Sequence, residues 1–227
     1  DHAADVGEGH CRPPADAVAR APRLDPEVRR GLIVDAAERL LAEGDPLLVT
    51  FEQVAAEAGV SRALVHAYLG DRRGLIDAVQ VRIVARLDAW VGHGLRRATE
   101  PRGALRAIVD GTFAFVEAEP DGWGVLLGSG GLDHPALHGV RARWAGALTS
   151  TDDRPNSAPH AVGEVASGAE FGVEVGAQAA VAGLLGGVGA WRARGVDPDL
   201  VVAALGRAVG LHVAGSTDAR DPAHQPW

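Results

Sequence analysis

Apolar residues recur every three or four positions along most of this chain of 227 residues, which is the period of helices that bury one face. Prolines and glycines divide this pattern into segments, because proline suits the first turn of a helix and glycine its end. Helices are therefore predicted at residues 25–43, 71–94, 105–116, 135–148 and 198–214, with a short apolar segment at 123–127 and a further helix within 162–194. No segment alternates apolar and polar residues as a strand does, so the predicted fold class is all-α.

Two shorter helices are predicted between the first two of these segments. Thr50 and Gln53 have the spacing of a capping box, in which each side chain bonds the other's backbone N–H at the start of a helix. Gly59 suits the end of that helix, and Ser61 is the N-cap of a second one that ends before Gly70. Two helices joined by a tight glycine turn form a helix-turn-helix.

This stretch resembles the DNA-binding signature of the TetR (tetracycline-repressor-like) family. The residues that carry the resemblance are Val54-Ala55, Ala58-Gly59-Val60-Ser61, Tyr68 and Leu75. The match reaches back to Val28 through a helix with a small-residue centre, and beyond Leu75 it is one of length and helical pattern. Departures from the family pattern are Ala63-Leu64-Val65-His66 in place of Gly-Thr-Leu-Tyr, Leu69 in place of Phe and Arg72 in place of Lys.

The resemblance implies an N-terminal three-helix helix-turn-helix domain, expected at residues 24–70, and a C-terminal helical domain for effector binding and dimerisation, expected at 71–215. Residues 1–23 and 216–227 have the polar, Gly- and Pro-rich composition of a flexible arm and a flexible tail. The arm contains Arg12, Arg20 and Arg23, so it is either a solvated tail or a basic arm that reaches into a minor groove.

The second motif helix is predicted to enter the major groove of double-stranded DNA, with each subunit of a homodimer on one half-site of a palindromic operator. Arg62, at its start, is predicted to contact a base, as a bidentate partner of guanine. Phosphate contacts are predicted for Thr50, Ser61, His66, Tyr68 and Arg72, and Ala63 and Leu64 complete the predicted DNA-binding set.

The net charge of -8 argues against a protein that coats nucleic acid without specificity, so DNA contact requires a local basic patch. Such a patch is predicted on the second motif helix and the segment after it, from Arg62, Arg72, Arg73, Arg82 and Arg86. The acidic residues Asp71 and Asp77 are the only ones between Ser61 and Arg86.

Residues of the body segment predict a cavity for a small-molecule effector. Aromatic side chains would line it and polar ones would orient the ligand, and the predicted residues are Trp90, Asp110, Phe113, Trp123, Trp144 and Gln178. For each residue taken singly, a place in the ordinary core is the alternative.

The segment 175–191 has no charge, and Ala179, Gly183 and Gly187 share one face at four-residue steps. Such a face allows two helix backbones to approach closely. The run is shorter than the ~20 residues of a membrane span, so a buried helix in the interface of a two-fold dimer is predicted, with no membrane partner. No N-terminal segment has the basic-then-apolar plan of a signal peptide, so a cytoplasmic location is expected. A close contact within one subunit is the alternative.

Other chemistry has weak support in the sequence. His134 and His138 have a spacing that can bind a metal, but no third ligand accompanies them, and helix capping is the alternative. No catalytic motif or cofactor-binding loop is present, and Cys11 lies in the arm, so neither an enzyme nor a cofactor is expected. The predicted function is a TetR-like transcriptional regulator, a repressor released from DNA by an effector; the alternatives are a small-molecule binding protein on the same scaffold and an all-α enzyme.

Overall fold

The computed structural model describes residues 25–45, 48–149 and 168–211. Within these ranges every regular element is a helix, so the all-α prediction is confirmed. The helices are α1 (Pro26–Glu43), α2 (Phe51–Ala58), α3 (Arg62–Leu69), α4 (Arg72–Leu95), α5 (Pro101–Ala118), α6 (Pro120–Gly128), the 3-10 turn η1 (Gly131–Asp133), α7 (Pro135–Thr149), α8 (Gly168–Ala193) and α9 (Pro198–Ala208).

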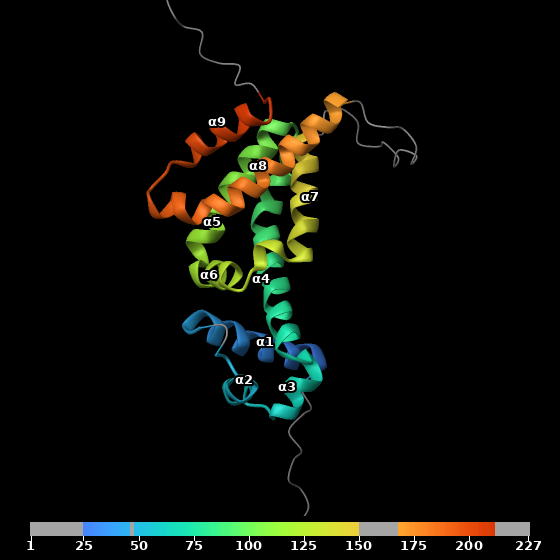
Figure 1. Ribbon diagram of the computed structural model, residues 1–227, viewed down its shortest axis with the longest axis vertical. Coiled ribbons are helices and arrows are strands. Elements are labelled where there is room, and N and C mark those ends of the chain that lie inside the picture. Colours follow the sequence, from blue (N-terminus) through green and yellow to red (C-terminus); the bar gives the residue numbers. More distant parts are fainter. Residues whose placement is uncertain (1–24, 46–47, 150–167, 212–227) are drawn as a thin grey trace, which may run out of the picture.

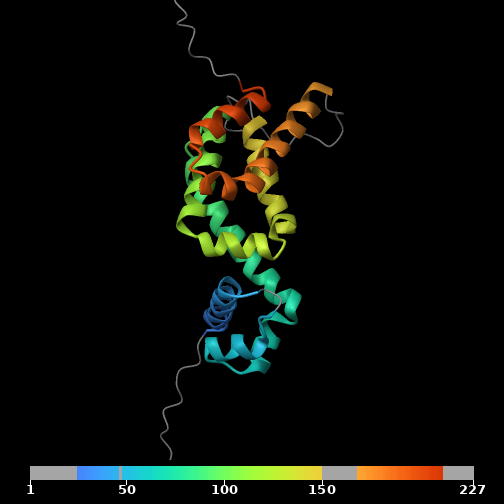
Figure 2. The same ribbon diagram turned by 60° about the vertical axis from the view of Figure 1, so that its left-hand side comes forward.

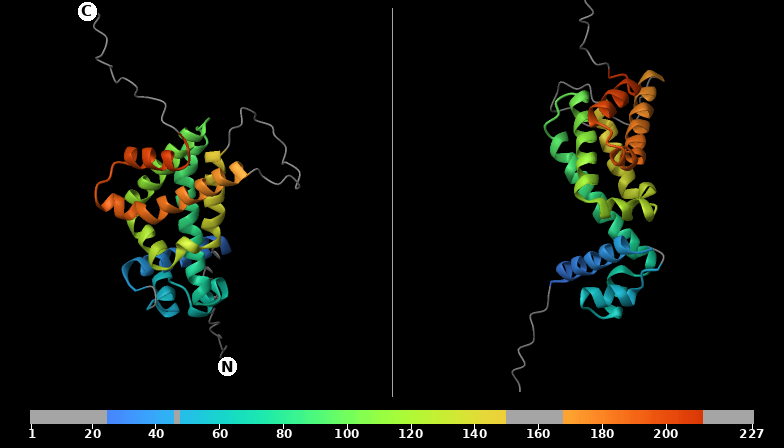
Figure 3. Two further views of the ribbon diagram at one scale, coloured as in Figure 1. Left: turned by 45° about the horizontal axis from the view of Figure 1, so that its top comes forward. Right: turned by 90° about the vertical axis from the view of Figure 1, so that its left-hand side faces the viewer.

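The helices form a small head and a larger body joined by α4. Helices α1 to α3 make the head, and α5 to α9 surround the other half of α4 in the body (Figures 1 and 2). In Figure 3 the head lies at one end of the molecule, with α1 facing the body. The head core consists of small and branched side chains, among them Ile33, Ala37, Val54 and Val65, all fully buried.

In the head, the observed helix boundaries lie where the capping signals of the sequence predict them. In the body, the observed boundaries differ from the predicted ones. The body helices begin or end at positions that the apolar pattern does not mark: α5 starts at Pro101, before the first core residue, and residues 120–128 form a complete helix. Helix α9 ends at Ala208, so the predicted extension to residue 214 is wrong; Gly210 adopts a left-handed conformation (φ 74°) that stops the helix. The predicted arm, the loop at 149–160 beyond Thr149, and the tail lie outside the described residues.

The body is held by close approach between helices. A side chain added at Gly111 of α5 would place its Cβ 2.8 Å from the Cα of Val91 of α4, and one at Gly94 would place its Cβ 2.8 Å from that of Ala107. These glycines let α4 and α5 pack backbone to backbone. Leu184, Leu185 and Val188 of α8 are buried in the body core.

One described helix is long and apolar enough to cross a membrane by length and composition. The window is Gly172–Ala193, with 22 residues and a mean hydropathy of 1.4, and a third of it is buried inside the fold. The argument that this run is too short for a span is therefore wrong, because the helix extends beyond the charge-free run on both sides. Its buried residues, among them Leu184, Leu185 and Val188, pack in the body core.

Candidate DNA-binding interface

The turn between α2 and α3 sets the geometry of the motif. Gly59 is left-handed (φ 66°), and the backbone N–H of Val60 donates to the carbonyl of Ala55 at 2.9 Å. The capping box at Thr50 and Gln53 is present, and the Ser61 hydroxyl accepts a hydrogen bond from the N–H of Leu64 at 3.2 Å. The predicted caps and stop signals of the motif are thus confirmed.

Burial divides α3 into an inner and an outer face. Val65 and Leu69 are buried in the head, and Leu64 and Tyr68 are half-buried beside them. The outer face consists of exposed side chains that lie one helical turn apart, namely Arg62, Ala63, His66 and Ala67. Sequence reasoning missed Ala67, although its spacing of four residues from Ala63 could have identified it.

Arg62, the predicted base contact, has a carboxylate beside it. Its Nε lies 2.9 Å from Oε1 of Glu52 at the start of α2, and 61% of each side chain is exposed. Both groups therefore face the solvent at the tip of the head.

His66 has a fixed ring orientation. Its Nδ1 lies 2.9 Å from the carbonyl oxygen of Gly70, and its ring meets that of Phe51 edge-on at 4.2 Å between centroids. Because a carbonyl oxygen accepts, Nδ1 carries the proton and the other ring nitrogen, Nε2, points away from this bond. A neutral His66 therefore offers an acceptor at Nε2, which suits a base amino group, whereas a phosphate contact requires the protonated ring.

Two of the remaining predicted phosphate contacts, Thr50 and Arg72, are engaged within the head. The Thr50 hydroxyl bonds both the N–H of Gln53, at 3.2 Å, and its Oε1, at 3.0 Å. Arg72 Nη1 donates to the carbonyl of Val49 at 3.0 Å, which ties α4 to the segment before α2. Arg73, the next residue, is exposed.

The predicted basic patch is not a single surface, and in this respect the sequence interpretation is wrong. Arg82 and Arg86 lie where α4 passes between head and body, and both bind Glu38 of α1. Arg86 Nε also donates to Glu119, at the start of α6, at 2.6 Å. Burial acts to lower the pKa of Arg86, but its hydrogen bonds and ionic contacts with Glu38 and Glu119 outweigh that effect and raise the pKa.

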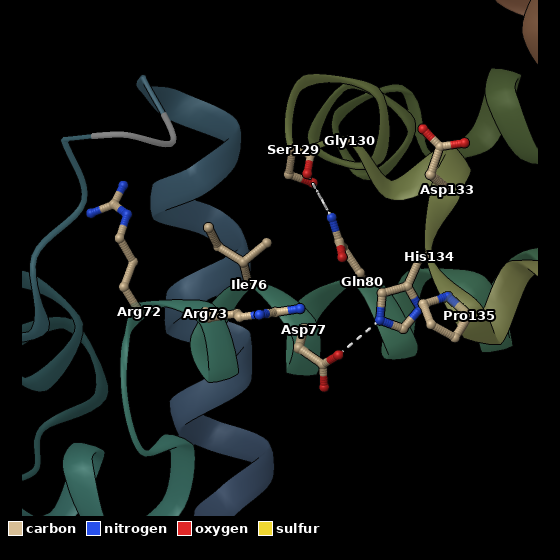
Figure 4. A pocket seen from close by; sticks show the side chains of 10 residues that line it. All are labelled: Arg72, Arg73, Ile76, Asp77, Gln80, Ser129, Gly130, Asp133, His134 and Pro135. Carbon is tan, nitrogen blue, oxygen red and sulfur yellow. Dashed lines mark hydrogen bonds and ion pairs between the residues drawn. The ribbon is translucent and has the colours of Figure 1, made fainter.

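A hollow of about 610 Å³ separates the head end of α4 from the turn between α6 and α7. Figure 4 shows Gln80 directed at Ser129 and the ring of His134 directed at Asp77. The amide nitrogen of Gln80 donates to the carbonyl and hydroxyl of Ser129, at 2.9 and 2.8 Å, and His134 Nε2 lies 2.8 Å from Oδ1 of Asp77. These contacts tie α4 to the connection between α6 and α7.

The structure does not gather the six predicted effector residues around one of the hollows it describes. The hollow of about 610 Å³ described above and two others, of about 290 and 470 Å³, are lined by side chains other than these six. Trp144 is buried and its Nε1 donates to Asp88 at 3.0 Å, while Asp110 pairs with Arg106 and Trp90 is 42% exposed.

The other three predicted effector residues belong to the body interior or its edge. Phe113 and Trp123 are buried, and Gln178 is half-buried on α8. Among the described residues, the Nε1 of Trp123 is the one buried side-chain polar atom without a hydrogen-bond partner. Trp123 packs edge-on against Phe115 and faces Gly189 of α8.

The possible metal site at His134 has a structural explanation. Its Nδ1 accepts a hydrogen bond from the N–H of Ala136 at 3.1 Å, so His134 caps α7. No group of three potential metal ligands occurs in the part of the chain that the structure describes.

Helix α8 presents a stripe of small side chains to the solvent. Its exposed members recur at three- and four-residue steps and are Gly172, Val175, Ala179, Ala182, Gly183, Gly186 and Ala190. Gly187 does not belong to this stripe as predicted, because a side chain there would meet the ring of Trp191 in the same subunit. Leu200 of α9 is a further exposed apolar side chain, with 66% of its surface accessible.

Comparison with known proteins places the helix-turn-helix in a family. Residues 33–79 match the family described as bacterial regulatory proteins, tetR family. The chain is 29% identical over 124 residues to the transcriptional activator FasR of Mycolicibacterium smegmatis, covering 55% of this chain and 57% of FasR. It is 34% identical over 97 residues to the transcriptional regulator BetI of Brucella canis, covering 42% of this chain and 49% of BetI. The matches thus span about half the length of these relatives.

Solved structures extend the likeness of fold to most of the chain. A putative transcriptional regulator from Pseudomonas aeruginosa has a TM-score of 0.60 at 21% identity and covers 85% of this chain and 94% of its own. A tetR-family regulator from Streptomyces coelicolor has a TM-score of 0.55 at 17% identity, with 83% of each chain covered. The helix-turn-helix thus matches the family of bacterial regulatory proteins called tetR over residues 33–79, and the fold resembles that of a solved tetR-family regulator over 83% of the chain.

Proposed function

We propose that the protein is a cytoplasmic transcriptional regulator that binds a palindromic operator as a homodimer and releases it when a small molecule binds the body. The observation that carries this proposal is the outer face of α3, where Arg62, Ala63, His66 and Ala67 are exposed at the far end of the head. The two alanines of this face allow the helix to approach base edges closely, and alanine can contact a thymine methyl group.

The surface of α8 and α9 supports the homodimer. A stripe of glycine and alanine lets two copies of α8 pack at short distance, and Leu200 of α9 is a further exposed apolar side chain. A two-fold axis there would present two copies of α3 to the same side of a duplex, at half-sites about 34–36 Å apart or a multiple of that distance.

The contacts between head and body support regulation by an effector. Arg86 bonds Glu38 of the head and Glu119 of the body at once, so a shift of α6 changes the position of the head. Trp123 lies on α6, and an acceptor group on a ligand could satisfy its indole N–H. A ligand that prefers one position of α6 would thereby favour one spacing of the two heads.

Selection of bound duplexes from a random DNA pool, with the purified full chain at moderate salt, tests the proposal. The expected result is a palindrome whose half-sites contain a guanine, with a dimer by light scattering. Recovery of no common sequence from folded, dimeric protein would contradict DNA recognition. The selected duplex can then be used to find compounds that release the protein.

A second candidate function is a small-molecule binding protein on the same scaffold with little affinity for DNA. Its support is that Arg62 is paired with Glu52 and that Arg82 and Arg86 are engaged at the junction. The two functions differ in the salt dependence of DNA binding, because phosphate contacts release counterions and give a steep slope. A flat slope at micromolar protein would favour the second function.

A further inference from the structure

Glu52 and Arg62 form an ion pair at the tip of the head, on the surface assigned to DNA. The pair joins the first turn of α2 to the first residue of α3 at 2.9 Å. Because 61% of each side chain is exposed, the pair adds little to the free energy of unfolding. The pair affects DNA binding by Arg62 more than it affects stability, because any duplex that approaches Arg62 also approaches the Glu52 carboxylate.

The pair leaves a defined part of Arg62 free. A guanidinium has five N–H donors on three nitrogens, and Nε is the nitrogen that lies beside Glu52, at 2.9 Å from Oε1. The two terminal amino groups remain, and together they form the fork that bonds O6 and N7 of guanine. The carboxylate thus orients the arginine for a base edge.

The same carboxylate weakens attraction to the DNA backbone. Phosphates within about 8 Å, the screening length at physiological salt, are repelled by Glu52 while they are attracted by Arg62. Since binding without sequence preference comes from cations that neutralise phosphates, an arginine paired in this way contributes little to it.

We propose that Glu52 is a specificity-determining residue, which acts through Arg62 by orienting its guanidinium toward guanine and by suppressing its binding to phosphate. This inference rests on the proposed DNA-binding function. Glu52 is a positioning residue in this account, and the base contact belongs to Arg62.

The test compares Glu52→Gln with Glu57→Gln in the full-length protein. Glu57 lies on the same helix and pairs with Arg39 of α1 at 2.9 Å, so its substitution changes the net charge equally without touching Arg62. Binding is measured by fluorescence anisotropy across a salt series, on the selected duplex and on a scrambled duplex of the same composition. Circular dichroism establishes that each variant is folded.

Glu52→Gln is expected to raise the affinity for the scrambled duplex about three- to tenfold near 0.1 M salt and to steepen the salt slope by up to about 0.9. The affinity for the selected duplex rises less, so the ratio of the affinity for the selected duplex to that for the scrambled duplex falls. Glu57→Gln leaves that ratio unchanged. Glu52→Ala, which removes the whole polar group beside Nε of Arg62, additionally loses the preference for guanine at the contacted position.

Equal changes in Glu52→Gln and Glu57→Gln would overturn the inference, because net charge alone would then explain both. If Glu52→Gln lost affinity for the selected duplex and gained none for the scrambled one, the inference would also be overturned, because Glu52 would then contact a base itself. If the unaltered protein prefers no duplex, the proposed function has failed and the inference falls with it.

Discussion

The head and the body are stabilised in different ways. In the head, α2 and α3 have eight residues each, and helices shorter than ~12 residues are marginal alone, so side-chain caps at Thr50 and Ser61 define where they begin. In the body, α4 and α8 have 24 and 26 residues and are fixed by burial and by glycine contacts. The two short helices of the head therefore owe their starting points to polar caps, and the long helices of the body are positioned by close packing.

The largest expected effect is in the body core. Trp144→Ala removes a side chain that is 1% exposed, together with its bond to Asp88, and is expected to lower the free energy of unfolding by about 3–5 kcal/mol. Trp90→Ala, at a position 42% exposed, is the matched control and should cost far less. Urea unfolding followed by circular dichroism measures both, and equal losses would contradict the difference in burial.

Close packing of α4 on α5 predicts the next effect. Gly111→Ala forces a methyl group against the backbone of Val91 and is expected to cost about 1–3 kcal/mol. Gly124→Ala, on α6, meets no atom within 4 Å and should be neutral or slightly stabilising. Thermal unfolding of the pair gives the comparison; a neutral Gly111→Ala would mean that the two helices separate easily.

The capping box of the head predicts a smaller loss. Thr50→Ala removes the acceptor for the N–H of Gln53 and is expected to cost about 1 kcal/mol, whereas Thr50→Ser keeps the hydroxyl and should cost little. Hydrogen exchange of the α2 amides is the sharper measurement, because fraying should be confined to the head. If the amides of the body helices lost protection from exchange to the same extent, the expectation that fraying is confined to the head would be contradicted.

These differences explain what the sequence could predict. Helix starts in the head were predicted to the residue because a cap and its partner lie three positions apart, as Thr50 and Gln53 do. The end of α9 depends on the conformation of Gly210, which an apolar pattern does not reveal. Pairs such as Arg86 with Glu38, 48 residues apart, depend on tertiary structure, and the predicted basic patch failed for this reason.

The candidate site was predicted in part by the same reasoning. The resemblance assigned five residues of α3 to DNA. The structure exposes Arg62, Ala63 and His66, whereas Leu64 and Tyr68 are half-buried. The sequence did not indicate that Glu52 approaches Arg62. The six residues assigned to an effector were chosen by type. Their assignment stays a prediction, because aromatic residues serve core and cavity equally well.

The smallest expected effect on stability is on α3. Arg62→Ala should change the free energy of unfolding by less than about 0.5 kcal/mol, because its ion pair is exposed, yet abolish the preference for guanine at one position of each half-site. Duplex selection repeated with this variant is the measurement. An unchanged palindrome would remove Arg62 from base recognition.

Because α4 runs without a break from the body to the head, a small tilt of α4 in the body displaces the head. A helix of 24 residues rises about 36 Å from end to end at 1.5 Å per residue, and glycine contacts fix its far half in the body. A tilt of about 5° at that anchor would carry the near end sideways by about 3 Å, the length of a hydrogen bond. The head can thus lose its alignment with a base edge through a small change of angle, without unfolding or bending of any helix.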